Sequence, residues 1–331
     1  MDKLKRKFGD RYDGWRVRNV DPLYQVVPII MRTRVDSQVF FDYDLNITEL
    51  EKFIREHRRT DMPDLRLLHV VMAACVRIMA GMPRLNRFVV GRKLYARNSM
   101  RISIACKRAM SVNVEDTTIM PEFEPEYTLY DVVNTVEKTI SEDVFAKQIE
   151  GNKTDVVARV LGAIPTFIKS AFVDLMRNLD KVGLMPKSIN KASPFHSSMF
   201  ITDLGSIGIG PIFHHLYEFG TCSVFVAIGK KETRHEVDKD GNVVTKRYIG
   251  LKIVGDERIC DGYYYATAMK ALARLIRHPE RLLTPPDEVV KDDFRRPKRG
   301  RNTWGNPVAV ERASAPAEQA DVQTEGEPAL K

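Results

Sequence analysis

The stretch GDERICDG, residues Gly255–Gly262, joins two segments of different periodicity. Before it, apolar and polar residues alternate from Tyr248 to Val254, which predicts a half-buried strand. After it, apolar residues recur at helical spacing, and Asp261 falls where a helix N-cap belongs. The helical positions are Tyr264, Ala268, Leu272, Leu275 and Ile276. The pattern predicts a strand-to-helix corner whose charged residues form either a functional site or a solvated turn.

The run Asp256–Gly262 resembles the Asp-His-Arg-x-x-Asp-Gly motif of the 2-oxoacid dehydrogenase acyltransferases. It is also similar to the His-x-x-x-Asp-Gly motif of chloramphenicol acetyltransferase, which shares their fold. The family's catalytic histidine is Glu257 in this sequence, and its second aspartate is Asp261. The resemblance implies an α/β fold, a chloramphenicol acetyltransferase-like two-layer sandwich with a mixed β-sheet and helices on one face. It also implies that Asp261 holds the site together and carries no proton.

A second match lies upstream of the corner. Residues Phe200–Gly205, with the sequence FITDLG, resemble the Phe-Thr-Ile-Ser-Asn-Leu-Gly segment of the same acyltransferases. Thr202 takes the place of the family's hydroxyl residue, which hydrogen-bonds the tetrahedral oxyanion. Ser198 is an alternative, because the register across the two acyltransferase groups is open. The other interpretation of Thr202 is an ordinary strand residue, a common place for threonine.

The residue at position 257 decides whether such a site has a base. The resemblance implies that Glu257 removes a proton from a hydroxyl or thiol acceptor. A carboxylate is a weak base near neutral pH, although burial in an apolar channel would strengthen it. His196, His214 and His215 are candidate substitutes, because each lies near the second motif or the strand after it. The alternative for Glu257 is an ion pair with Arg258 or another basic residue.

The N-terminal residues 15–18, WRVR, form a weaker match. Chloramphenicol acetyltransferase has a tryptophan near its N-terminus, followed by an arginine that pairs with the aspartate of its Asp-Gly motif. The resemblance therefore implies that Arg16 or Arg18 pairs with Asp261. The alternative is a basic arm outside the site.

Two classes of function follow from these matches. The first is an acyltransferase that moves an acyl group from acyl-coenzyme A, a co-substrate and not a bound cofactor, to a small hydroxyl or thiol acceptor. The second is a catalytically silent trimeric binding or scaffold protein, because the histidine is replaced. In both classes the resemblance implies a homotrimer whose two motifs meet across a subunit interface. No segment resembles a lipoyl or subunit-binding domain, so we expect a stand-alone protein.

The domain organisation has three expected segments. Residues 1–20 form a basic N-terminal arm, residues 21–285 form the acyltransferase-like domain, and residues 286–331 form a polar, disordered tail. Residues 152–190 are a helical insertion that the resemblance does not cover.

The insertion contains an amphipathic run over residues 156–185, which Pro165 breaks into two helices. These helices either pack on the domain or touch a membrane surface. Packing is favoured, because Asp174 and Asp180 weaken attraction to anionic lipid.

Composition limits the kinds of ligand and the cellular location that we expect. The formal net charge of +8 suits an anionic ligand such as coenzyme A, and no nucleic-acid-binding motif accompanies it. The four cysteines lie far apart in apolar runs, which predicts free thiols of a reducing cytosol and no zinc or other metal site. The first residues contain no apolar signal segment, and no apolar run is long enough to span a bilayer. We therefore expect a cytoplasmic protein.

Other elements follow from periodicity and from turn residues. The patterns predict strands over residues 35–44, 89–95, 101–106, 111–115, 197–202 and 221–229. They predict helices over residues 48–58, 64–82 and 129–149. They also predict a hairpin turn over residues 238–242. The helix over 64–82 has the clearest apolar stripe, and Pro83 ends it.

Overall fold

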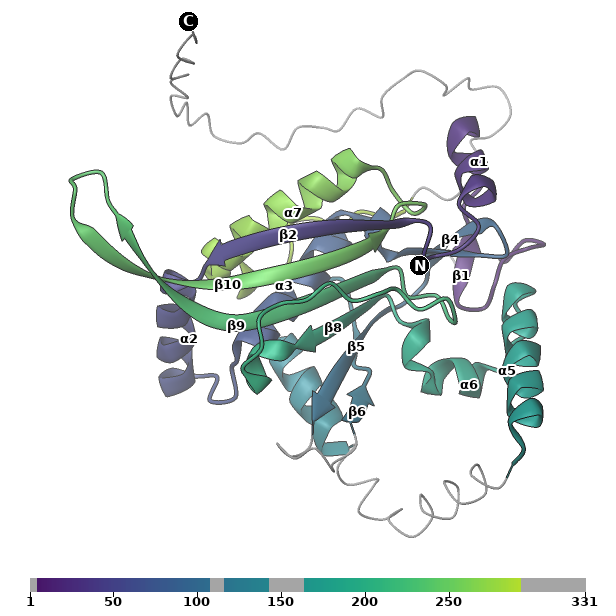
Figure 1. The fold of residues 1–331 in the computed structure, drawn as a ribbon, viewed down its shortest axis with the longest axis horizontal. Helices are drawn as coiled ribbons and strands as arrows, with labels where there is room; N and C mark the ends of the chain where they lie inside the picture. Colours follow the sequence, from purple (N-terminus) through teal and green to yellow (C-terminus); the bar gives the residue numbers. More distant parts are fainter. Residues whose placement is uncertain (1–4, 108–115, 143–163, 293–331) are drawn as a thin grey trace, which may run out of the picture. The chain divides into compact units, whose positions relative to one another are not determined.

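The computed structural model describes residues 5–107, 116–142 and 164–292. Its main sheet has the strand order β2 (Gln38–Asn46), β10 (Val243–Asp256), β9 (Val224–Val237), β8 (Met199–Asp203), β5 (Met100–Lys107) and β6 (Asp116–Ile119), and β7 (Glu122–Phe123) pairs with β5. The first three strands are antiparallel neighbours, whereas β8 runs parallel to both β9 and β5. The sheet is therefore mixed, as predicted (Figure 1).

A layer of helices covers one face of this sheet. α3 (Leu67–Gly81) and α7 (Gly262–Arg277) lie behind the strands, with α2 (Thr48–Thr60) at one end (Figure 1). α3 is buried along almost its whole length, as expected of a helix that is apolar on most sides. Its side chains and those of α7 form one core with Ile201, Val226 and Ile253 of the strands. The predicted two-layer α/β sandwich with helices on one face is confirmed.

The opposite face of the sheet is crossed by residues 208–223. Phe200, Phe225 and Val254 point to this face and form a second apolar cluster with Leu216. Pro211 lies directly on the strands: a Cβ at Gly229 or Gly250 would lie 2.3 or 2.6 Å from it. Glycines at these two positions therefore let the loop approach the sheet. We call this side of the sheet the loop face.

A smaller sheet pairs β1 (Gly14–Arg16), β4 (Lys93–Arg97) and β3 (Arg87–Val90). The prediction of a single strand over residues 89–95 is wrong, because β3 and β4 form a hairpin. Gly91 and Arg92, the two turn residues, both have positive φ, +56° and +62°. This pair of φ values is typical of a tight hairpin turn, but arginine is not a usual residue there.

The predicted basic arm contains ordered structure. β1 belongs to the smaller sheet, Val17 is buried, and α1 (Pro22–Ile30) follows. α1 was not predicted, because it has a proline inside it, Pro28, where a helix loses one backbone hydrogen bond.

The predicted helix over residues 129–149 is present at residues 129–142. Within the predicted insertion, Pro165 immediately precedes α5 (Thr166–Lys181), and the short α6 (Lys187–Ala192) follows. The strand predicted over 111–115, the first helix of the insertion and the chain after residue 292 lie outside the described residues. No helix in the described part of the chain combines the length and apolar character needed to cross a membrane.

Candidate functional site

The strand-to-helix corner is built on a buried ion pair. The Asp256 carboxylate is 0% exposed and accepts from Arg258 at 2.8 Å (Nε) and 2.7 Å (Nη2). Ser37 donates to the same carboxylate at 3.0 Å, and Arg34 Nε lies 3.6 Å from it. Gly255 before it has no room for a side chain, because a Cβ would lie 2.7 Å from the Tyr265 ring. The first and third residues of the motif are therefore structural.

Glu257 lies between these buried residues and is half-buried. Its backbone N–H donates to the carbonyl of Ser37 at 2.8 Å. Arg258 is engaged with Asp256, so the alternative pairing of Glu257 with Arg258 is wrong. Among the described residues the Glu257 carboxylate has no hydrogen bond or ion pair. The pKa of Tyr24 in α1 is raised by burial and then by Asp261, Cys260 and Glu257.

Asp261 is the N-cap of α7, as predicted. Its carboxylate accepts from the backbone N–H of Tyr264 at 2.8 Å, and its own backbone is extended. The implied pairing with an arginine is not seen. Arg18 pairs with Asp10 at 2.7 Å, and the Asp10 carboxylate also accepts from the backbone N–H of Arg16. The physical reason is the smaller sheet, whose strand β1 and flanking turn hold both arginines near Asp10.

β8 places Thr202 on the loop face. Met199 and Ile201 point into the core below the helices, so Phe200 and Thr202 point to the other side. Thr202 is 9% exposed, and among the described residues its hydroxyl has no hydrogen bond. Ser198 is different, because its hydroxyl accepts from the backbone N–H of Arg101 at 3.1 Å. Thr202 is therefore the better placed of the two candidate oxyanion donors.

The three histidines have different surroundings. His196 is fully buried, with Nδ1 2.8 Å from Ser193 Oγ and Nε2 3.5 Å from Asp180. These contacts fix the His196 ring in the interior, so His196 is a structural residue. His214 stacks on Phe225 with ring centroids 4.4 Å apart, which places it on the loop face with Thr202.

His214 has a buried Nδ1 without a hydrogen-bond partner among the described residues. Burial, and then the neighbouring His215, lower the pKa of His214, so its ring is neutral at neutral pH. His215 is exposed. Of the three substitutes, His214 is the one that combines a free nitrogen with the face that carries Thr202.

The two motifs do not meet within one chain. Thr202 lies opposite Ala227 of β9, which lies opposite Lys252 of β10. Glu257 follows Lys252 by five residues, about 16 Å along the strand, and is two strand spacings, about 10 Å, to the side. A single copy of the chain therefore cannot bring both side chains to one reacting group.

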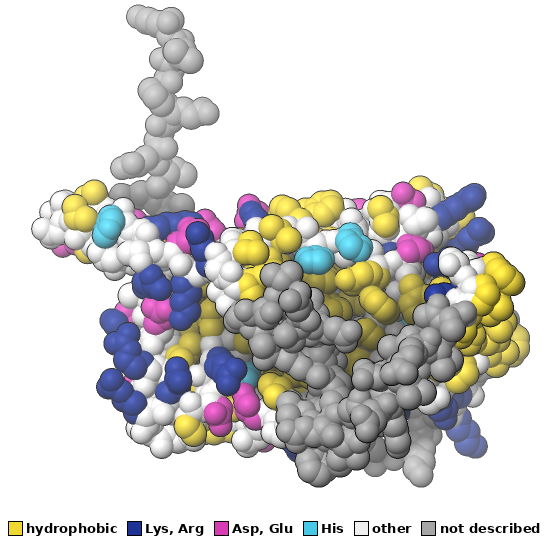
Figure 2. Space-filling model, turned by 60° about the horizontal axis from the view of Figure 1, so that its bottom comes forward, with side chains coloured by type: hydrophobic (Ala, Val, Ile, Leu, Met, Phe, Trp, Pro, Cys, Tyr) yellow, Lys and Arg dark blue, Asp and Glu magenta, His cyan; other side chains and the backbone are white. Residues whose placement is uncertain are grey.

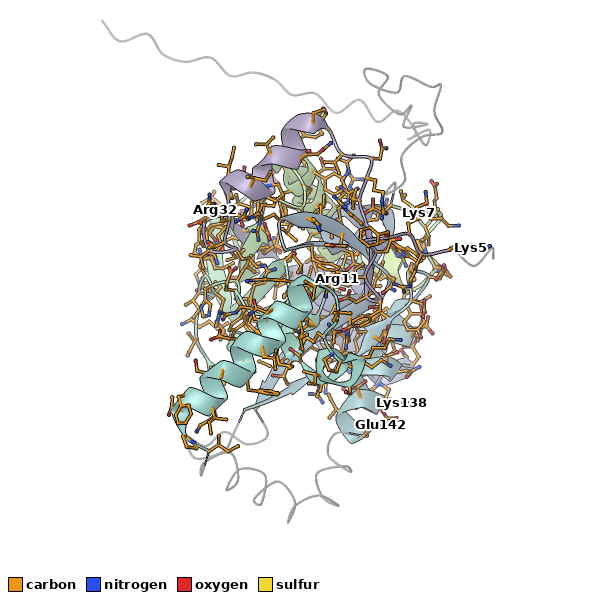
Figure 3. The ribbon with its side chains drawn as sticks, turned by 90° about the vertical axis from the view of Figure 1, so that its right-hand side faces the viewer. Lys5, Lys7, Arg11, Arg32, Lys138 and Glu142 are labelled. Carbon is orange, nitrogen blue, oxygen red and sulfur yellow. The ribbon has the colours of Figure 1, made fainter. Side chains whose placement is uncertain are left out.

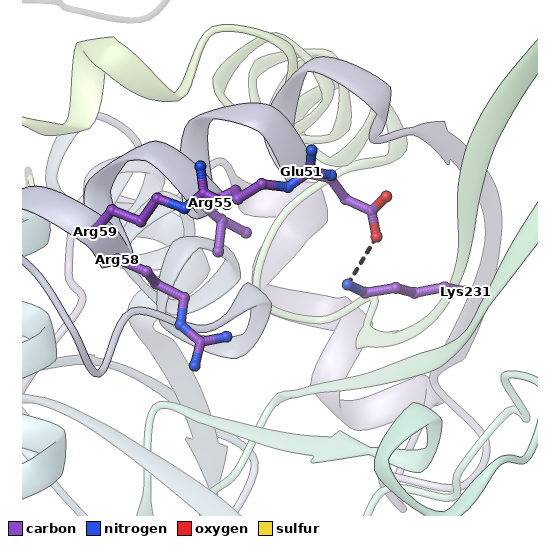
Figure 4. Close-up of a pocket in the computed structure, with 6 residues that line it drawn as sticks. Glu51, Arg55, Arg58, Arg59 and Lys231 are labelled. Carbon is purple, nitrogen blue, oxygen red and sulfur yellow. Dashed lines mark ion pairs between the residues drawn. The ribbon is translucent and has the colours of Figure 1, made fainter.

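A basic groove was missed by the sequence analysis. It has a volume of about 450 Å³ between α2 and β9 and is lined by Glu51, Ile54, Arg55, Arg58, Arg59 and Lys231 (Figure 4). Lysine and arginine side chains gather over α2 (Figure 2). The helix positions 51, 55, 58 and 59 share one face, a spacing that could have indicated the groove.

Glu51 anchors one side of the groove. Lys231 Nζ lies 2.8 Å from its carboxylate and Arg247 Nε lies 3.3 Å away. Burial alone would raise the pKa of Glu51, but these two cations hold it below its usual value. Arg55, Arg58 and Arg59 have no ion pair with any described residue. The groove thus keeps an excess of positive charge that suits a phosphorylated ligand.

The described residues contain no group of three His, Cys, Asp or Glu side chains that could hold a metal ion. Cys75, Cys222 and Cys260 are buried free thiols. For these three cysteines, the predicted thiol state is confirmed.

Comparison with known proteins bears on both motifs. The family model of the 2-oxoacid dehydrogenases acyltransferase (catalytic domain) matches residues 185–284. This range contains β8, the corner and α7, and it confirms the resemblance found in the sequence. The match begins inside the predicted insertion over 152–190. No curated protein matches the chain.

Several solved structures are similar in fold. A probable dihydrolipoamide acetyltransferase from Listeria monocytogenes is 11% identical, with a TM-score of 0.49 over 78% of this chain and 93% of that chain. The dihydrolipoamide acetyltransferase of Azotobacter vinelandii is 15% identical, with a TM-score of 0.47 over 80% and 93%. A chloramphenicol acetyltransferase is 8% identical, with a TM-score of 0.43 over 75% and 92%.

Proposed function

We propose, from the premise that residues 185–284 resemble the acyltransferase catalytic domain, that this protein transfers an acyl group from acyl-coenzyme A to a small hydroxyl or thiol acceptor. The observation that carries the proposal is that both matched motifs occur in order, with Thr202 on the loop face and Asp261 capping α7. The active form is a homotrimer, in which Thr202 of one copy faces Glu257 of the next. The separation of these residues within one chain supports that arrangement.

The basic groove supports coenzyme A as the acyl carrier. Coenzyme A carries its phosphates at one end and its sulfur at the end of a long, flexible arm. Lys231 follows Ala227 by four residues on β9, about 13 Å along the strand from the level of Thr202. Arg55, Arg58 and Lys231 would hold the phosphates on the helix side of the sheet, and the arm would pass the end of β8 to reach Thr202 on the loop face.

The reaction follows from these positions. Glu257 takes the proton of the acceptor hydroxyl or thiol, whose oxygen or sulfur attacks the thioester carbonyl carbon. The carbonyl oxygen becomes negative, and the Thr202 hydroxyl donates a hydrogen bond to it. The carbon–sulfur bond then breaks, and the departing sulfur of coenzyme A takes the proton from Glu257. His214 is the alternative base.

A second function is a catalytically silent binding protein. The specific observation in its favour is Glu257 in the histidine position, between two residues that serve structure alone. Such a protein would retain the trimer and the groove but not the chemistry.

Two measurements on the same preparation separate these functions. Calorimetric titration measures coenzyme A affinity, and thiol release from acetyl- and longer acyl-coenzyme A measures thioester cleavage. Binding with acceptor-dependent cleavage supports the acyltransferase. Binding without cleavage supports the silent protein, and absence of both contradicts the coenzyme A proposal.

A further inference from the structure

α5 is held to the domain at one end. Met176 and Asp180 are its buried residues. Arg11 donates to the Asp180 carboxylate at 2.6 Å and is itself held by Asp13 at 2.8 Å. His196 lies 3.5 Å from the same Asp180 carboxylate. Arg11 is labelled beside the end of α5 in Figure 3. This buried network fixes the helix, so its outer side is a surface of defined shape.

The outer side carries a line of apolar residues, which we call the α5 seam: Ile168, Phe172, Leu175, Leu179 and Val182. Their spacing alternates between four and three residues, the 3.5-residue repeat of a helix that packs against another helix. Ile168 is 47% exposed, Phe172 55%, Leu175 53% and Val182 66%, and Leu179 is half-buried. Hydrophobic side chains gather at this edge of the molecule (Figure 2).

The area of this surface suits self-association. Phe167 and Leu184 extend it, with exposures of 73% and 70%. The exposed apolar side chains amount to roughly 500 Å² per copy, at the upper end of the patches that monomers leave open. Two such surfaces covering each other bury about 1,000 Å², which reaches the lower limit of a specific interface.

The polar residues beside the seam favour a second helix over a lipid surface. Ala171 and Asn178, which border it, are small or uncharged and are exposed, so another copy can approach without charge repulsion. On the polar side, Asp174 and Arg177 pair with each other at 3.5 Å. A helix that lies on a membrane carries a polar face rich in lysine and arginine, and this face has mixed charge.

We propose that the α5 seam pairs with the α5 seam of a second copy of this chain about a two-fold axis. A two-fold contact places the same patch on both partners, so Leu175, at the centre of the seam, meets Leu175 of the other copy. This contact joins like patches, whereas a trimer joins unlike ones. The inference therefore does not depend on the trimer or on catalysis.

The test compares the solution mass of the full chain with that of a Phe172→Glu, Leu175→Glu variant by light scattering. We expect the variant's mass to fall to half, with its melting temperature unchanged, because both side chains are half exposed. Ser170→Glu adds one negative charge on the polar side of the helix, against two in the double variant, and should keep the full mass. Separately, Leu175→Cys should form a disulfide-linked pair on mild oxidation, and Ser170→Cys should not.

Three results would overturn the proposal. One is an unchanged mass together with no Leu175→Cys link. Another is an unchanged mass with a lowered melting temperature, which would show that the same chain covers the seam. The third is an unchanged mass with loss of binding to phosphatidylcholine–phosphatidylserine vesicles, which would assign the seam to lipid.

Discussion

The corner over residues 255–262 and the basic groove beside α2 use their charges in opposite ways. In the corner, Asp256 and Arg258 are buried against each other, and Asp261 caps a helix. In the groove, Arg55 and Arg58 are exposed and have no ion pair with a described residue. The corner lies inside the family match, whereas the groove's arginines, which α2 supplies, lie outside it. The comparison teaches that the motif with the strongest resemblance uses most of its charges for the framework, with Glu257 as the exception, whereas the unpaired arginines lie elsewhere.

The largest expected effect comes from the buried pair of the corner. Asp256→Asn leaves Arg258 and Arg34 without their carboxylate in a buried site, which typically costs about 3–5 kcal/mol of stability. Denaturant unfolding measures this cost. The matched control is the neighbouring Glu257→Gln, which should change stability by less than about 0.5 kcal/mol. Equal costs for the two variants would show that the corner is not a framework.

A second effect concerns pH and the first turn of α3. Burial, the largest cause, lowers the pKa of His69 in α3 from 6.5 to about 4. The Arg66 cation lowers this pKa further and Asp64 opposes the shift, while Glu137 lies 3.4 Å from Nε2. However, Nδ1 accepts from the backbone N–H of Arg66 at 3.3 Å, which a protonated ring could not do, so the lowered pKa stands.

The direction in which stability changes with pH follows from the unfolded chain. Below pH 6.5 the unfolded chain binds a proton at His69, whereas the folded chain does not. The stability that neutral His69 contributes is therefore fully present above pH 6.5 and is lost as pH falls towards about 4. The loss is at most about 3 kcal/mol, at about 1.36 kcal/mol per pKa unit. Unfolding measured from pH 4 to 7 should show this slope in the native chain and a flatter one in His69→Gln. Equal slopes of stability against pH in the native chain and in His69→Gln would contradict this role of His69.

A third effect tests the groove. Arg58→Gln removes one phosphate-binding charge and should weaken coenzyme A binding about tenfold, because a hydrogen bond to a charged group is worth about 1.5–3 kcal/mol. Arg177→Gln, an exposed arginine on α5, is the matched control and should bind as the native chain does. Calorimetric titration decides, and equal weakening by both variants would leave the groove without a specific role.

The smallest effect tests the cap of α7. Asp261→Ala removes the acceptor for the Tyr264 N–H and should cost about 1 kcal/mol of stability. Asparagine caps helices about as well as aspartate, so Asp261→Asn should cost close to nothing. The same unfolding measurement compares them. If Asn costs as much as Ala, the charge of Asp261 matters more than its cap.

Local signals in the sequence predicted the parts of the fold that depend on neighbouring residues. β10, the Asp261 cap and α7 follow from periodicity and from one capping residue. The hairpin at Gly91 and Arg92 was missed, because its turn lacks the usual residues. Networks between distant segments were missed for a different reason: the pairing of Asp256 with Arg34 depends on how the chain folds and leaves no local pattern.

The candidate site also divides into residues with a local sequence signal and residues brought together only by the fold. Thr202 and Asp261 could be located because each belongs to a contiguous motif. The implied pairing of Arg16 or Arg18 with Asp261 is not seen, because Asp10, in the turn before β1, accepts from Arg18 at 2.7 Å. The groove combines α2 with Lys231 of β9, residues whose contact depends on the fold.

The most direct test of acyl transfer at this site is the turnover number of Thr202→Val against the native chain, measured with saturating acyl-coenzyme A and a thiol acceptor. Valine keeps the shape of Thr202 and removes its hydroxyl. An oxyanion donor acts only when charge develops, so turnover should fall about 10²–10³-fold while coenzyme A affinity stays the same. Full turnover by Thr202→Val would contradict the account, as would a native chain that cleaves no thioester.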